Sequence, residues 1–371
     1  MLQQAARSTA FGLYEFYSAF TMWPKVVRED LRAGVKAKHQ GNLNTSVRYL
    51  TRALETALAL PLDELSPNPH AKLSGIAIVL GEVLELANKP AEAYDVYAAA
   101  LLRLQNAMKK PTSVPISGPE RVRAASLAFK LGEMAEMYSQ PEEEEERWLT
   151  FAVEEMLRIL RDTQSPEKSR DVTESGSTNS GKQSVDLDEL ELPAWVGRDD
   201  VVAPLEKLGA FYNRQGKQEW AVPLYLSALS VLLPANTSRD VPPETKCQGA
   251  HIMNSLAASL AAQESTSAAA RISQSEKWAE KAIALVNSAK SSNLDAEVSS
   301  YCDAVLVAAL FNMGSLKEMN GESFDAKQWY TSSHKLATSV GERGGIMEAE
   351  QALRRLNRPQ RGKQDTQSGK L

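Results

Sequence analysis

The chain of 371 residues lacks most features that mark metalloproteins, membrane-spanning proteins and nucleic-acid-binding proteins. Its 2 cysteines, Cys247 and Cys302, have no metal-type spacing, and its 4 histidines are scattered. We expect two unpaired small core cysteines, with a disulfide between them as the alternative. No window reaches the roughly 18 uncharged apolar residues of a membrane span. The net charge of −5 includes no basic excess for nucleic acid.

Motifs of catalysis and cofactor binding are also missing from the sequence. It contains no HExxH pair, no P-loop, no dinucleotide-binding glycine motif and no nucleophile elbow. The glutamate run 142–146 follows Pro141, which suits the first turn of a helix better than it suits an acidic binding patch. We therefore predict that the protein is not an enzyme and has no catalytic residues, no metal and no cofactor.

What the sequence does contain is a repeated pattern of small and aromatic residues. The segment 208–229, LGAFYNRQGKQEWAVPLYLSAL, splits at Gly216 into two runs with apolar residues at i, i+3 and i+4. This spacing predicts two helices joined by a tight turn. Small residues on both runs would allow close packing, with tyrosines filling the gaps beside them.

The same offsets recur along the chain, which a single chance match would not explain. A more degenerate copy covers 252–263 and 275–286, and the copy around Gly132 contains one inserted residue. Across the copies, the residues that we expect to pack the paired helices together are Gly34, Gly81, Tyr97, Gly132, Gly209, Tyr212, Ala221, Tyr225, Ala228, Gly314 and Tyr330.

This pattern resembles the tetratricopeptide repeat, although successive glycines at 34, 81 and 132 lie 47 and 51 residues apart and the usual repeat has about 34 residues. The extra residues must lengthen the second helix or the connection between hairpins. We predict an all-α fold of tetratricopeptide-like helical hairpins that form a right-handed superhelical solenoid with a C-terminal capping helix.

Composition divides the chain into segments. Residues 163–186 and 359–371 have too few apolar residues to bury, so we expect a disordered insertion and a disordered tail. The predicted organisation is an N-terminal segment over 1–24, repeats one to three over 25–162, the insertion over 163–186, repeats four to six over 187–337, a capping helix over 338–358 and the tail over 359–371.

In tetratricopeptide folds, one face of each hairpin's first helix lines a concave groove. Transferring that register predicts a peptide-binding groove lined by Leu31, Val35, Lys38, Ile78, Glu82, Glu85, Phe129, Glu133, Met137, Asn213, Arg214, Phe311 and Met319. Exposed apolar residues and adaptable methionines among carboxylates are typical of a surface that binds protein partners. The alternative for some of these residues is packing against the neighbouring repeat.

The segment FTMWPKVVREDLRAG (20–34) and the fourth repeat give a more specific likeness. The chain resembles, over about 20–337 without the insertion, the fungal mitochondrial tetratricopeptide proteins that serve as substrate adaptors of the inner-membrane i-AAA protease. This resemblance implies a domain on the intermembrane-space side that binds unfolded or misassembled membrane proteins beside a second adaptor subunit. Family members carry a transmembrane helix ahead of the tryptophan-proline motif, and none precedes Met22-Trp23-Pro24, so we expect membrane association through a segment absent here.

A second hypothesis remains open at this point. The same hairpins suit a scaffold or assembly factor for a mitochondrial complex, which would use the convex face of the array instead of the groove. Substitutions in the groove would then be silent, and substitutions on the outer helices would disrupt assembly.

Overall fold

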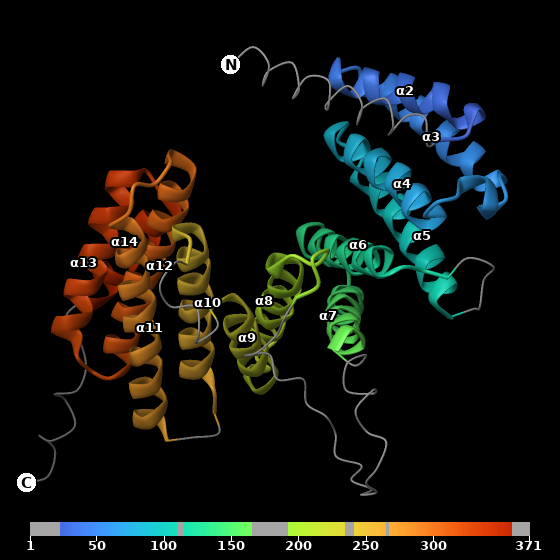
Figure 1. Ribbon diagram of the computed structural model, residues 1–371. Helices are drawn as coiled ribbons and strands as arrows, with labels where there is room; N and C mark the ends of the chain where they lie inside the picture. Colours follow the sequence, from blue (N-terminus) through green and yellow to red (C-terminus); the bar gives the residue numbers. More distant parts are fainter. Residues whose placement is uncertain (1–22, 110–114, 165–191, 234–240, 265–266, 358–371) are drawn as a thin grey trace, which may run out of the picture. The chain divides into compact units, whose positions relative to one another are not determined.

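Helices form every regular element in the part of the chain that the structure describes, and no strand occurs there. The computed structural model describes residues 23–109, 115–164, 192–233, 241–264 and 267–357 (Figure 1). The chain divides into two compact units, one of residues 1–178 with 193–196 and one of residues 179–192 with 197–371. Each unit is a row of helical hairpins, so the predicted all-α hairpin fold is confirmed.

The first unit contains three hairpins within the described ranges. Their paired helices are α2 (Lys25–His39) with α3 (Leu43–Ala59), α4 (Pro69–Leu86) with α5 (Pro90–Lys109), and α6 (Gly118–Met137) with α7 (Glu142–Gln164). A short 3-10 helix, η1 (Leu62–Leu65), lies in the connection between α3 and α4. The long repeat spacing therefore comes from this connection and from long second helices, of 20 residues in α5 and 23 in α7.

The second unit follows the same plan and ends with one additional helix. Its elements are α8 (Arg198–Arg214) with α9 (Gln218–Leu232), α10 (Pro243–Ala262) with α11 (Ala268–Lys290), α12 (Ala296–Met319) with α13 (Ser323–Val340), and then α14 (Arg343–Asn357). Helix α14 packs on the last hairpin by burying Ala349 and Ala352. A capping helix was expected over 338–358, but residues 338–340 belong to α13, and α14 starts after Gly341 because that residue ends α13 in a left-handed conformation.

Close approach of the two helices in a hairpin depends on the small residue of the first helix. A Cβ at Gly81 would lie 2.2 Å from Cε1 of Tyr97, and one at Gly34 would lie 2.7 Å from Cγ of Leu50. The residue that fills the gap follows its glycine by 16 positions, or by 17 after Gly132. These pairs are Gly34–Leu50, Gly81–Tyr97, Gly132–Leu149, Gly209–Tyr225 and Gly314–Tyr330. They confirm the predicted offsets, and Tyr212, Ala221 and Ala228 are also buried as expected.

The turn of each of these hairpins is made by a residue with positive φ, seven positions after the small residue. The next backbone N–H then reaches back into the first helix, as from Asn42 to the carbonyl of Ala37 (2.8 Å). This bond satisfies a carbonyl that the helix end would otherwise leave unpaired. The turn residues and their φ values are Gly41 (73°), Asn88 (58°), Ser139 (51°), Gly216 (70°) and Gly321 (81°).

The cysteine prediction was wrong in one respect. Cys247 and Cys302 lie in the core as expected, but they form a disulfide between α10 and α12 with a Cα–Cα distance of 5.3 Å. The 2 residues are 55 positions apart, so no local pattern indicates that the fold brings them together. They become neighbours because the hairpin α10/α11 places α12 beside α10.

Three predicted segments fall largely outside the described residues. They are the N-terminal segment 1–24, the insertion 163–186 and the tail 359–371. Where the insertion is described, at residues 163–164, it forms the last turn of α7 and not an irregular segment.

Helix α12 is the one described helix that is long and apolar enough to cross a membrane by length and composition. It lies in the middle of the second unit, where it contacts α10, α11, α13 and α14. Its buried side chains, among them Val305 and Met313, pack against these neighbours. Such packing is also what the central helix of a helical array requires.

Candidate protein-binding surface

The predicted groove residues lie on the first helices of their hairpins, but they differ in exposure. Glu82, Met137, Arg214 and Met319 are exposed, and most of the others are half-buried. Leu31 is only 7% exposed and belongs to the core of the first unit. Its assignment to the groove was wrong because the side chain lies in this core, to which the paired helix α3 contributes Leu50 and Ala53.

The aromatic groove residues are also less free than expected. Phe129 is half-buried and packs against the core of the first unit, as Val35 and Ile78 do. Phe311 is half-buried as well, and its ring centroid lies 5.1 Å from that of Tyr330. These side chains support the fold of their hairpins, so they are poor candidates for open anchors of a partner.

In the five hairpins that contain a glycine pair, one position near the end of the first helix is always exposed, and we call it the tip position. It is the fifth residue after the small residue of the first helix. The side chains at the tip position of α4, α6 and α12 are large and apolar: Leu86 is 62% exposed, Met137 68% and Met319 55%. In the two remaining hairpins His39 and Arg214 stand there, both exposed. The register transfer therefore placed Met137, Arg214 and Met319 correctly on open surface.

The carboxylates of the first unit are not the free ring that the sequence indicated. Glu82 on α4 pairs with Lys38 on α2 (2.6 Å), and Glu85 pairs with Lys130 on α6 (2.9 Å). These ion pairs join the first helices of successive hairpins. Because a lysine partly neutralises each glutamate, this surface is less negative than the sequence predicted. Lys130 was not identified from the sequence, because the pairing depends on the distance between hairpins.

Glu85 has a second role within its own hairpin. The buried Tyr97 donates its phenol to Glu85 (2.7 Å), and Tyr330 donates to Glu318 in the same way (2.9 Å). Burial raises the pKa of both phenols, and the adjacent carboxylates add to the effect. The recurring contact gives each buried tyrosine a hydrogen-bond partner at the surface.

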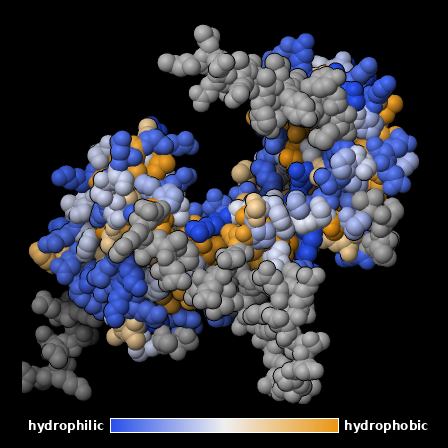
Figure 2. Space-filling view, in the orientation of Figure 1, coloured by the Kyte–Doolittle hydropathy of each residue, from blue (hydrophilic) through white to orange (hydrophobic). Residues whose placement is uncertain are grey.

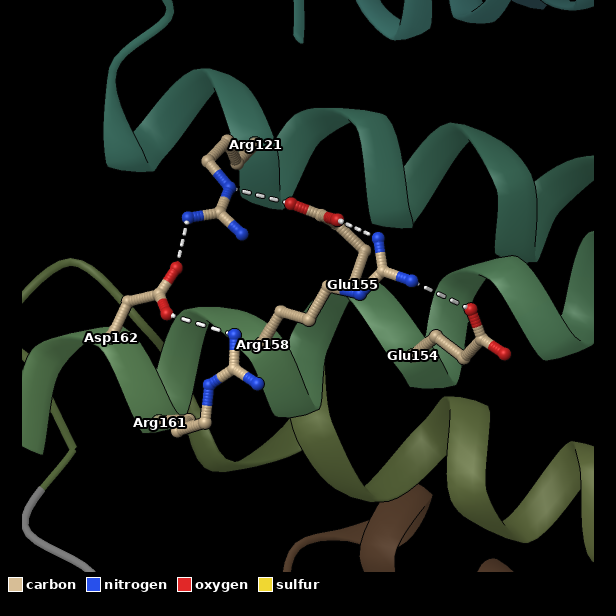
Figure 3. A network of polar contacts seen from close by, with 6 residues as sticks. All are labelled: Arg121, Glu154, Glu155, Arg158, Arg161 and Asp162. Carbon is tan, nitrogen blue, oxygen red and sulfur yellow. Dashed lines mark hydrogen bonds and ion pairs between the residues drawn. The ribbon is translucent and has the colours of Figure 1, made fainter. Parts of the chain in front are cut away.

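A polar network binds α6 to α7 in the first unit (Figure 3). Arg121 donates to Glu155 (2.5 Å) and to Asp162 (2.8 Å), and Arg158 and Arg161 extend the network along α7. The hydrogen bond from Arg121 lowers the pKa of Asp162. Glu155 is buried with these cations around it, so the network fixes the packing of the hairpin and offers no open site.

The second unit has a cavity of about 540 Å³ near the starts of α8, α10 and α12. Burial and the charges of Glu206 and Glu244 raise the pKa of Tyr301 in its wall to about 12. Glu206 also lies 3.2 Å from His251, and this contact raises the pKa of the imidazole. The lining residues are Asp199, Glu206, Glu244, Gln248, Asp295, Glu297, Val298 and Tyr301. Within the described ranges, no group of three His, Cys, Asp or Glu residues could hold a metal ion.

On the face drawn in Figure 2, apolar and polar side chains are interspersed in both units. Large exposed apolar side chains within such a mixed surface would offer a partner several small contact sites. The Asn213 side chain, which was predicted to face a partner, instead accepts a hydrogen bond from Ser259 on α10 (2.8 Å).

Comparison with known proteins agrees with the fold. No protein-family model matches the chain. A TPR repeat-containing protein of Schizosaccharomyces pombe is 30% identical over 157 residues, which cover 41% of this chain and 40% of that protein. The match thus spans less than half of the relative's length.

Among solved structures, BtubC from P. vanneervenii is similar with a TM-score of 0.51 and 14% identity, over 81% of this chain and 92% of that chain. The S. pombe nuclear import adaptor Nro1 has a TM-score of 0.48 and 12% identity, over 88% of this chain and 95% of that chain. At such identities the likeness to BtubC shows a shared fold alone. The chain has an all-helical fold of stacked hairpins, like that of solved tetratricopeptide-type structures.

Proposed function

We propose that this protein is a non-enzymatic adaptor that recruits unfolded or misassembled membrane proteins to the i-AAA protease of mitochondria. It acts on the intermembrane-space side of the inner membrane, beside a second adaptor subunit. The protein binds its substrates through the first helices of its hairpins and performs no chemistry on them.

The observation that carries the binding function is the tip position. Leu86 and Met137 expose more than half of their surface at equivalent places of successive hairpins. A large apolar side chain that is exposed at the same position of several repeats gains nothing from folding, whereas a partner can bury it. Methionine adapts to partners of different shape, which suits an adaptor for many unfolded segments.

Two further observations support the mitochondrial setting. The segment FTMWPKVVREDLRAG and the fourth repeat resemble the adaptors of the i-AAA protease, whereas tetratricopeptide hairpins as such serve many partners. The disulfide between Cys247 and Cys302 favours a compartment that permits oxidised thiols, because disulfides are rare in cytosolic proteins.

The binding surface is tested by Leu86→Glu combined with Met137→Glu in the full chain. The readout is the affinity for a permanently unfolded, thiol-blocked test protein, and we expect a loss of about tenfold or more, which corresponds to about 1.4 kcal/mol. Leu102→Glu is the matched control, because Leu102 is 57% exposed but lies on the second helix α5. Substitution of Phe129 or Phe311 would be uninformative, since both support the fold.

The protease partner is tested separately by affinity capture from mitochondria that express the same variants. The double variant Leu86→Glu/Met137→Glu, which we call the tip variant, should still capture the i-AAA protease but should lose bound substrate proteins. Unchanged substrate capture by that variant contradicts the proposed surface. If the protease is never captured while an assembly intermediate is, and only Leu102→Glu disrupts that capture, the scaffold hypothesis is correct instead.

A further inference from the structure

The cavity of the second unit gathers like charges at the ends of neighbouring helices. Glu244 lies in the first turn of α10, Glu297 in the first turn of α12, and Asp295 caps α12. All three carboxylates line the cavity together with Asp199 and Glu206 of α8. The next cation on α10, Lys246, donates to Ser288 of α11 (3.2 Å). Glu206 has His251 as a partner (3.2 Å), whereas the other carboxylates repel one another within the cavity.

The disulfide lies directly behind this cavity. Gln248 and Tyr301, which line the cavity, are the immediate neighbours of Cys247 and Cys302 in the sequence. Both cysteines are fully buried in a cluster with Ala250, Ala282, Val286, Ala289, Val305 and Leu306. Without the S–S bond, the first two turns of α10 and α12 are held here by packing and by polar contacts to α11, from Lys246 to Ser288 and from Lys290 to Asp303. The amide pair Asn312–Asn254 (3.0 Å) joins the same two helices farther along both.

We propose that the Cys247–Cys302 disulfide is a redox latch that holds the first turns of α10 and α12 together against the repulsion of their carboxylates. The thiol state then sets how far the walls of the cavity open, independently of what the protein binds. In the reduced state the carboxylates separate, the first turns fray, and the helices stay joined at Asn254 and Asn312.

The redox step is ordinary thiol–disulfide exchange with a dithiol. One thiolate of the dithiol attacks a cysteine sulfur, the S–S bond breaks, and a mixed disulfide forms. The second thiol of the reagent closes its own ring and releases that cysteine, so two electrons and two protons pass to the protein. Because both sulfurs are buried, reduction requires prior opening of the helix ends.

The latch is tested by hydrogen exchange and mass spectrometry on the full chain at low salt. We compare the oxidised protein with Cys247→Ala/Cys302→Ala, and use protein reduced with dithiothreitol as a second sample without substitutions. Amides of residues 243–250 and 296–303 should exchange at least about tenfold faster without the disulfide. Exchange in α3, in the other unit, should stay the same.

Charge variants separate the latch from simple loss of a cross-link. In the cysteine-free protein, Glu244→Gln with Glu297→Gln should slow the exchange again, and 1 M salt should act in the same direction. The matched control is Glu280→Gln, an exposed carboxylate on α11 that does not line the cavity, and it should have no effect. Equal exchange in the oxidised and both disulfide-free samples overturns the proposal. The proposal is also overturned if loss of the disulfide accelerates exchange but neither Glu244→Gln with Glu297→Gln nor 1 M salt slows it again.

Discussion

Two glycines of α4, six residues apart, show how strongly the surroundings of a single residue decide its role. A Cβ on Gly81 would lie 2.2 Å from the ring of Tyr97, whereas a Cβ on Gly75 would meet only the end of the Arg123 side chain at 3.5 Å. The packing of this hairpin therefore requires a residue without a side chain at position 81. At Gly75 the glycine only lowers the helix propensity.

Opposite effects follow for the same substitution at these two positions. Gly81→Ala should lower the free energy of unfolding by about 1–3 kcal/mol, because the new methyl group forces Tyr97 out of its site. Gly75→Ala should raise it by up to about 1 kcal/mol through helix propensity. Urea unfolding followed by circular dichroism measures both, and a stabilising Gly81→Ala would show that the tyrosine moves at no cost.

At the scale of the element, the hairpin is defined by its turn as much as by its helices. Three of the turns described above use glycine at the left-handed position, and two use Asn88 and Ser139. A residue with a Cβ is strained in that conformation, asparagine less than serine. The hairpins α4/α5 and α6/α7 therefore contain a small, removable strain in their turns.

Ser139→Gly should stabilise the first unit by about 1 kcal/mol, because glycine adopts the left-handed conformation without strain. Asn88→Gly should act in the same direction with a smaller effect. Ser126→Gly is the matched control, since the same change inside α6 should cost about 0.5–1 kcal/mol. Denaturant titrations of the three variants test the order, and destabilisation by Ser139→Gly would contradict the account of the turn.

At the scale of the whole molecule, a row of stacked hairpins must end without exposing its apolar side. In the second unit α14 performs this function, with Ala352, Leu353 and Leu356 against the last hairpin. Arg355 fixes the helix further by two hydrogen bonds to Glu318 of α12 (3.0 and 2.7 Å). The hydrogen bonds from Arg355 and from Tyr330 lower the pKa of Glu318.

A pH dependence of this array end follows from that lowered pKa. The contribution of Glu318 to stability is complete above the unfolded-state pKa of a glutamate, about 4.3, and is lost as the pH falls through the lower folded-state pKa. Arg355→Ala should therefore destabilise α14 at pH 7 by up to about 1 kcal/mol and much less at pH 3. Hydrogen exchange of α14 at both pH values measures this difference.

Arg354→Ala provides the comparison, because Arg354 pairs with Glu350 inside the same helix (2.8 Å). Its effect should be smaller than that of Arg355→Ala, since this pair does not join α14 to α12. Equal effects of the two variants, or an effect of Arg355→Ala that persists unchanged at pH 3, would show that the ion pair to Glu318 does not hold the helix.

The hairpins of this protein follow from patterns that lie close together in its amino-acid sequence. Apolar periodicity, a small residue, a turn seven positions later and an aromatic or aliphatic residue at a constant offset all lie within one repeat, so local spacing was sufficient to predict them. The pairs Gly209–Tyr225 and Gly314–Tyr330 follow from such spacing alone.

Which residues of the first helices are free to bind depends instead on how whole hairpins pack against one another. Glu82 and Glu85 are paired with Lys38 and Lys130, which come from other hairpins, and Leu31 is buried in the core of the first unit. The disulfide joins residues 55 positions apart through the same stacking. Contacts between hairpins are set by the distance and angle at which whole repeats pack, and the spacing inside one repeat carries no information about either.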